Sequence, residues 1–231
     1  MPYFNNNVVN ILFIHIPKTG GSSIECYFSG KYNIPLNKES FWCEWYNLTN
    51  TRVSLQHLTY NDIKNNLNHN NLTIITVVRN PYTRIVSDLF FCNLINITTT
   101  KEQVSDIIKN YLHRNDLDNH NIPQFKFIEN ADNIIILKQE TLDKDMHKIG
   151  YTDFNQRYNE NQNKVDYFDY LNKESIAIIN NFYKKDFELF SYRMITFQLP
   201  FQFVQLHFQL PFQFVQQHFQ LPFQEYFQFV Q

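Results

Sequence analysis

The chain has 231 residues, 43% of them hydrophobic, which is enough to bury the core of one domain of ordinary size. A formal net charge of -2 gives no overall positive field and argues against a nucleic-acid-binding protein. No apolar run is long enough for a membrane span and no signal peptide is visible, so the sequence predicts a soluble domain with room for an enzyme site.

The first predicted elements lie in "ILFIHIPKTGGSSIE", Ile11 to Glu25. The apolar run Ile11 to Ile14 predicts a buried parallel strand, and the residues after the two serines predict a helix. The turn between them carries a positive charge, two glycines and the helix start, where free backbone N–H groups favour a phosphate or sulfate. The candidate anion loop is Lys18, Thr19, Gly20, Gly21, Ser22 and Ser23.

This loop differs from the common nucleotide-triphosphate loop, G-x-x-x-x-G-K-[ST], because its lysine precedes the glycines. A donor that needs no metal ion across its phosphates therefore fits better than ATP. By itself a Gly-Gly turn after a strand is compatible with a purely structural role as well.

Further along the chain, strands and helices continue to alternate. Strands are expected at Thr51–Leu58, Thr73–Val78 and Asn133–Leu137, and helices at 59–67, 82–95, Lys101–His113, Glu140–Lys148 and Lys173–Phe190. This alternation predicts an α/β fold with a parallel sheet, in which ligands bind at the carboxyl ends of the strands.

The last part of the chain has a different character. A segment of Phe and Gln begins at Phe197 and repeats from Phe208 and Phe219, which is low complexity with too short a period for a solenoid. We expect residues 1–195 to form the domain and residues 196–231 to be an appendage outside the fold.

A second motif, "TVVRNPYTRIVS", runs from Thr76 to Ser87 and puts Arg79 at a strand end and Ser87 eight residues later in the next helix. The two side chains could bind one anion, although a surface ion pair and an idle helical serine explain them as well. Together, "HIPKTGGSS" and "VVRNPYTRIVS" resemble the two donor-binding motifs of sulfotransferases of the carbohydrate type. "SLQHLTYNDI", "IPQFKFI" and "FYKKDFELFSY" extend the resemblance from about Ile11 to Tyr192.

The resemblance implies a P-loop-like three-layer α/β fold with a central parallel sheet flanked by helices. It implies the co-substrate 3'-phosphoadenosine 5'-phosphosulfate (PAPS), with Lys18 to Ser23 around the 5'-phosphosulfate, Arg79 and Ser87 at the 3'-phosphate, and no metal. Lys18 would stabilise the leaving phosphate, and His57 would take the proton of an acceptor hydroxyl on a carbohydrate or glycoconjugate. His15 is expected to be a core histidine, and the other histidines carry no placement signal.

Two other functions remain open on the sequence. One is a protein of the same fold that binds a nucleotide or glycan without chemistry. The other is a nucleotide kinase, which the position of Lys18 and the lack of an obvious magnesium carboxylate after the second strand disfavour. Nucleotide preference would distinguish them, because a ligand that binds the folded state raises its stability.

Overall fold

A computed structural model of the chain describes residues 1–42, 45–48, 51–155 and 165–197. Residues Met1–Ile195 form one compact unit. The predicted tail, 196–231, lies outside the described residues except for Thr196 and Phe197. Among the residues that the structure describes, no helix has both the length and the apolar character needed to cross a membrane.

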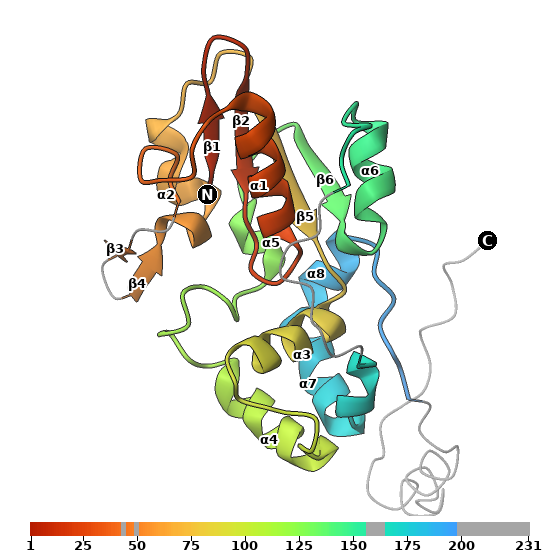
Figure 1. Ribbon diagram of the computed structural model, residues 1–231. Coiled ribbons are helices and arrows are strands. Elements are labelled where there is room, and N and C mark those ends of the chain that lie inside the picture. The colour runs from red at the N-terminus through yellow and green to blue at the C-terminus, as the bar shows by residue number, and fades with distance from the viewer. Residues whose placement is uncertain (43–44, 49–50, 156–164, 198–231) are drawn as a thin grey trace, which may run out of the picture. The chain divides into compact units, whose positions relative to one another are not determined.

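The centre of this unit is a four-stranded sheet with the strand order β1-β2-β5-β6 (Figure 1). Strands β2 (Asn10–Ile14), β5 (Thr73–Val78) and β6 (Ile134–Lys138) are parallel, and β1 (Tyr3–Asn5) pairs antiparallel with β2 at the edge. The parallel strands coincide with the three strongest apolar runs of the sequence, so the predicted α/β fold is confirmed. Strand β1 escaped prediction because three residues are too few to show a hydrophobic period.

Helices cover both faces of the sheet. One face packs against α1 (Gly21–Tyr32) and α6 (Leu142–Lys148), and the other against α2 (Tyr60–Ile63) and α5 (Gln124–Phe127). Successive side chains of a strand point to opposite faces, which is why Phe13 joins the first of these cores and Leu12 the second. The fold therefore has three layers.

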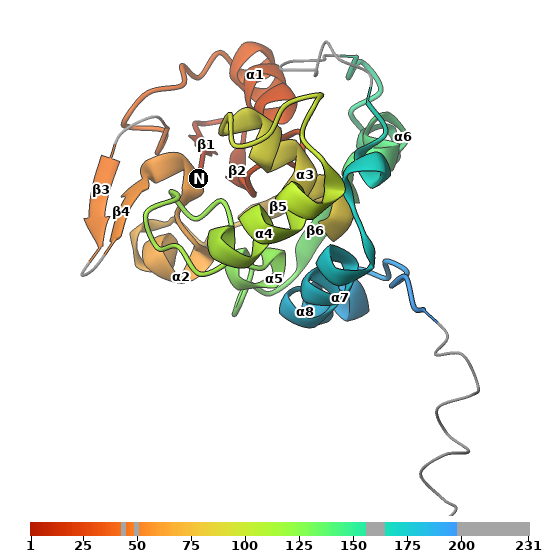
Figure 2. The same cartoon turned by 90° about the horizontal axis from the view of Figure 1, so that it is seen from below.

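Four further helices pack together beyond the carboxyl ends of the parallel strands (Figures 1 and 2). They are α3 (Pro81–Phe91), α4 (Lys101–Tyr111), α7 (Lys173–Phe182) and α8 (Lys184–Leu189). Helix α3, predicted at 82–95, begins at Pro81 and ends at Phe91, and the side chain of Asn80 caps it by accepting the N–H of Tyr82 at 3.0 Å. Of these four helices, α3 lines the cavity at this edge of the sheet, through Ser87, Phe90 and Phe91.

The predicted helix Lys173–Phe190 is wrong in its length, because the chain breaks at Tyr183 into α7 and α8. The buried Tyr183 donates its hydroxyl to the carbonyl of Asn121 at 2.7 Å, and Asp186 in the first turn of α8 accepts the N–H groups of Gln124 and Phe125. Contacts with a distant segment thus override a continuous helical pattern. Helix α4 ends at Tyr111, and the predicted helix at Glu140 starts with a 3-10 turn, so α6 begins at Leu142.

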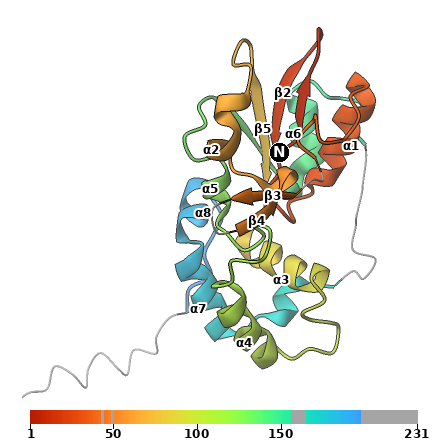
Figure 3. The same cartoon turned by 90° about the vertical axis from the view of Figure 1, so that its left-hand side faces the viewer.

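The predicted strand Thr51–Leu58 is also corrected. Strand β4 covers only Thr51–Ser54, and it pairs with β3 (Trp45–Leu48) in a separate two-stranded hairpin (Figure 3). A 3-10 turn, Leu55–His57, follows it, so His57 stands on a turn and not at the end of a strand. The predicted helix at 59–67 is a short α2 and a 3-10 turn, and Thr59 is the N-cap of α2.

Candidate functional site

The predicted anion loop joins β2 to α1 with an unusual backbone. Lys18 and Gly20 have φ values of 66° and 89°, in the left-handed region, and Gly20 is the N-cap of α1. That conformation favours glycine at position 20. Thr19 is fully buried, and its hydroxyl donates to the carbonyl of Ile16 at 2.8 Å. The side chain of Thr19 therefore braces the loop from inside.

One cavity of about 1080 Å³ opens at the carboxyl ends of the parallel strands. It contains every residue that the sequence assigns to the donor or to catalysis except Thr19, namely Lys18, Gly20, Gly21, Ser22, Ser23, His57, Arg79 and Ser87. A second cavity, of about 500 Å³, lies near the β1–β2 turn and is lined largely by asparagines. Because the charged and titratable candidates meet in the larger cavity, we take it as the candidate site.

Arg79 follows β5 directly, and its side chain contacts both the anion loop and helix α3. Its Nη1 donates to the carbonyl of Lys18 at 3.1 Å, and its Nε donates to Thr83 at 3.1 Å. The guanidinium also lies 5.0 Å from the ring centroid of Tyr167, and its backbone exchanges two hydrogen bonds with the side chain of Gln124. These contacts hold the guanidinium beside the anion loop.

The ammonium group of Lys18 lies in the same cavity, 3.9 Å from the ring centroid of Phe91. Burial lowers the pKa of Lys18 below its ordinary value, and the nearby Asp88 carboxylate acts against that shift. A cation on an aromatic face is attracted by the ring and only partly hydrated. The ammonium group of Lys18 is therefore available to pair with an anion that enters the cavity.

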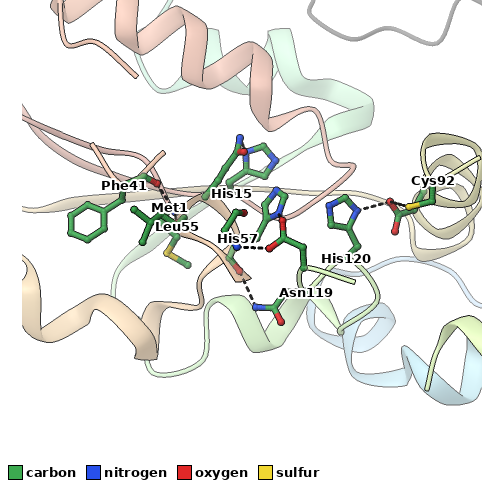
Figure 4. A network of polar contacts seen from close by, with 12 residues as sticks. Met1, His15, Phe41, Leu55, His57, Cys92, Asn119 and His120 are labelled. Atoms are coloured by element: carbon green, nitrogen blue, oxygen red, sulfur yellow. Dashed lines mark hydrogen bonds and ion pairs between the residues drawn. The ribbon is translucent and has the colours of Figure 1, made fainter. Parts of the chain in front are cut away.

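Three histidines lie in a row along the cavity, each paired with its own carboxylate (Figure 4). His15 pairs with Glu25, His57 with Asp118 at 2.7 Å, and His120 with Asp88 at 2.7 Å. The ring centroids are 5.1 Å apart for His15 and His57, and 4.9 Å apart for His57 and His120. In each pair the ring uses Nδ1, so Nε2 is the nitrogen left for another partner.

The environment of His57 favours its neutral form. Burial lowers the pKa of His57 to about 4, against the opposing effect of its hydrogen bond to Asp118. The same hydrogen bond holds the pKa of Asp118 below its ordinary value despite the partial burial of that carboxyl group. A neutral imidazole with Nδ1–H donated to a carboxylate has its Nε2 lone pair available as a proton acceptor.

His15 is buried, as predicted for a core histidine, but it also supports the anion loop. A Cβ atom at Gly21 would lie 2.8 Å from Nδ1 of His15, so any other residue there would force the ring or the loop to move. Glu25 is buried as well, and Gln56 donates to both of its carboxylate oxygens, at 2.9 and 2.8 Å. The ring of His15 is therefore fixed directly beneath the start of α1.

Two residues of the site carried no recognisable signal in the sequence. His120 lines the cavity, although nothing in the sequence placed it there. Arg84 is buried and donates to the carbonyls of Pro17, Ile122 and His120 at 3.0, 3.0 and 2.7 Å. Arg84 thus ties the anion loop to the segment that carries His120.

Comparison with known proteins gives one family. A model of the sulfotransferase family matches residues 2–193. No curated protein and no solved structure matches the chain.

Proposed function

The chain belongs to the sulfotransferase family and is therefore a transferase, and from this premise we propose that it moves a sulfuryl group from PAPS to a hydroxyl of a carbohydrate acceptor. The observation that supports the donor most directly is that two anion-binding elements, the Lys18–Ser23 loop and the Arg79–Ser87 pair, line one cavity. PAPS carries anions at both its 5' and 3' ends, so it needs two such elements.

The two elements suit different ends of the donor. Backbone N–H groups at the start of α1 favour the 5'-phosphosulfate, since the helix dipole and unpaired donors both attract an anion. The guanidinium of Arg79 can bind two oxygens of the 3'-phosphate at once, and Ser87 can donate a further hydrogen bond. A donor without the 3'-phosphate would leave Arg79 and Ser87 without a ligand.

In the proposed reaction a bond forms between sulfur and the acceptor oxygen, while the bond from sulfur to the bridging phosphate oxygen breaks. Negative charge grows on that bridging oxygen as adenosine 3',5'-bisphosphate leaves. Lys18, which lies in the cavity on the loop before α1, stabilises this charge. A metal ion is not required for that step.

The acceptor hydroxyl becomes a better nucleophile when it loses its proton during the attack. His57 takes that proton on Nε2, because Nδ1 is held by Asp118 and the ring lines the cavity. His120 lies next to it and can hydrogen-bond the same acceptor. Aromatic rings of Trp42 and Phe91 and the amides of Asn93 and Asn96 complete a lining compatible with a sugar.

Calorimetry with adenosine 3',5'-bisphosphate and adenosine 5'-monophosphate tests the donor site. We expect the bisphosphate to bind more tightly, and Arg79→Ala to weaken it by roughly 10- to 150-fold, since hydrogen bonds to charged groups contribute about 1.5–3 kcal/mol. Arg114→Ala, which removes an exposed arginine paired with Asp116 outside the cavity, is the matched control. Equal affinity for the two nucleotides would contradict the assignment of Arg79 and Ser87.

Transfer itself is measured with labelled PAPS and a panel of neutral and acidic glycans, in the presence of a chelator that removes magnesium. Labelled sulfate on a glycan supports the proposal and identifies the acceptor. Strict dependence on ATP and magnesium, with phosphate on the product, would instead indicate a kinase. Tight bisphosphate binding without transfer to any acceptor would favour a binding protein.

A further inference from the structure

Two neighbouring histidines of the cavity, His57 and His120, lie close to the carboxylate of Asp118. The proposed reaction does not require all three side chains to be so close together. His57, Asp118 and His120 each offer one ligand atom, and these atoms all lie within 4.8 Å of one another. His57 comes from the 3-10 turn after β4, whereas Asp118 and His120 come from the segment between α4 and α5. Two imidazoles and one carboxylate therefore converge from separate parts of the chain.

The backbone that carries two of these ligands is held in an uncommon conformation. Asp118 and Asn119 have consecutive positive φ values of 50° and 61°. The N–H of Ser54 donates to the Asp118 carboxylate at 2.5 Å, and the Asn119 side chain donates to the carbonyl of His57 at 3.0 Å. Aspartate and asparagine adopt this conformation more readily than most residues, and the two hydrogen bonds hold the segment against the turn that carries His57.

His120 has the partner that metal-binding histidines usually have. Its Nδ1 is hydrogen-bonded to Asp88, a buried carboxylate that also accepts the hydroxyl of Tyr111. A carboxylate on the far ring nitrogen fixes the tautomer and makes the other nitrogen a better ligand. Figure 4 shows the rings of His57 and His120 next to each other.

We propose that His57, Asp118 and His120 bind a divalent transition metal ion of the zinc type, with the remaining position open to the cavity. Two imidazole nitrogens and one carboxylate oxygen are a ligand set that Zn²⁺ accepts, and zinc sites with three protein ligands leave a fourth position open. The hydrogen bond between His57 and Asp118 opens when the ion binds, and the neutral His57 ring keeps its single proton on the nitrogen that does not bind the metal. The ligand atoms must then approach to about 3.3 Å, as Zn–N distances of ~2.0–2.1 Å require.

Such an ion would coordinate the imidazole of His57, which the proposed reaction uses as its base. Zinc would therefore inhibit sulfuryl transfer, and this consequence rests on the proposed function. The metal site itself rests only on the geometry of the three residues, so binding and inhibition can be tested apart.

The experiment uses the full chain without an affinity tag, freed of metal by a chelator. Calorimetry with Zn²⁺ should give one ion per chain, and Co²⁺ should give visible absorption bands of a coordinated ion that Zn²⁺ displaces. Asp118→Asn and His120→Gln should each lower Zn²⁺ affinity at least 10-fold, and Asp88→Asn by roughly 10- to 100-fold through the outer carboxylate. Asparagine tolerates the left-handed backbone at position 118, so that variant keeps the local fold.

Matched controls are His113→Gln and Asp116→Asn, which change exposed residues outside the cluster and should leave Zn²⁺ affinity unchanged. The ligand atoms of Asp88, Cys92 and His120 also lie within 4.8 Å of one another and form an alternative set of metal ligands. Cys92→Ser removes a ligand from this alternative set only, so it shows which of the two sets binds zinc. If zinc binding survived Asp118→Asn but not Cys92→Ser, the assignment would be wrong.

The melting temperature of each variant without metal checks its folding. A zinc-induced rise in the wild type and in the control variants, but not in Asp118→Asn or His120→Gln, gives a second readout. Absence of zinc binding to the wild type at micromolar concentrations would overturn the proposal. Zinc that binds through these three residues but leaves transfer unaffected would support the metal site and contradict the role of His57 as the base.

Discussion

Replacing Gly21 by alanine tests how closely the anion loop and the histidine row are packed together. The new Cβ would lie 2.8, 2.9 and 3.1 Å from Nδ1, Cε1 and Cγ of His15. Approaches below 3.0 Å force one of the two groups to move. The ring of His15 cannot retreat freely, because Nδ1 is paired with Glu25, which Gln56 and Trp42 hold in place.

The expected cost follows from overpacking a rigid site. Inserting a methyl group into a close-packed interior typically destabilises a protein by about 1–3 kcal/mol. Alanine recovers part of this, since it is a better helix former than glycine by about 1 kcal/mol or less at a helix start. We therefore expect Gly21→Ala to lower the free energy of unfolding by roughly 1–2 kcal/mol and the melting temperature by ~2–8 °C.

Gly30→Ala is the matched control, because Gly30 lies in the same helix and a Cβ there would meet nothing within 4 Å. It should raise the melting temperature by ~2–4 °C, as alanine stabilises a helix by about 1 kcal/mol over glycine. The assay is thermal and urea unfolding of both variants, followed by calorimetry with adenosine 3',5'-bisphosphate. Only Gly21→Ala should also weaken nucleotide binding.

A His15→Ala background sharpens the test. Without the ring, Gly21→Ala should cost almost nothing beyond the loss caused by His15→Ala itself. A Gly21→Ala protein that melts at or above the wild-type temperature would refute the packing argument. So would an equal cost of Gly21→Ala in the presence and absence of the His15 ring.

Four further predictions concern the rest of the site. Arg84→Met should lower the free energy of unfolding by about 3 kcal/mol or more in urea, because three backbone carbonyls lose their buried donor, while Arg114→Met on the surface should change it by less than about 0.5 kcal/mol. The buried Glu25 has a pKa lowered below its ordinary 4.5, chiefly by His15 and against the effect of its burial, so its contribution to stability is complete above pH 4.5 and is lost as the pH falls below it. Glu25→Gln should therefore flatten the fall in melting temperature between pH 5 and pH 3, and an unchanged slope would exclude Glu25 as its source. Lys18→Ala should weaken bisphosphate binding and slow transfer, whereas His57→Gln should slow transfer and leave bisphosphate affinity nearly unchanged; full turnover by His57→Gln would remove it as the base. Deletion of Phe197–Gln231 should leave melting and nucleotide binding unchanged, and loss of cooperative melting would show that the repeat contributes to the fold.

The sequence by itself determined the elements whose information is local. The apolar runs at Ile11–Ile14 and Thr73–Val78 predicted two parallel strands, since a strand buried on both faces needs no partner to be recognised. The donor motifs were visible for the same reason. In each, a strand end, a turn and a helix start follow one another within a dozen residues, so the position of Lys18 or Arg79 follows from the order of the chain.

Tertiary structure decided whatever depends on residues far apart in the chain. His120 meets Asp88 across 32 residues and His57 meets Asp118 across 61, and no period or motif marks either pair. Their encounter is set by how α3 and the segment before α5 pack at the sheet edge, with Arg84 joining that segment to the anion loop.

The same reason explains the elements that were mispredicted. The residues of β4 suit a strand of the main sheet equally well, but β4 pairs with β3 in a separate hairpin. The pairing partner of a strand depends on tertiary packing, which local propensity does not reveal. The break at Tyr183 comes from its bond to Asn121, and no residue near position 183 announces it. Local propensity thus specified the strands and the donor loop, whereas long-range packing brought His57 and His120, each paired with a carboxylate, to the wall of one cavity.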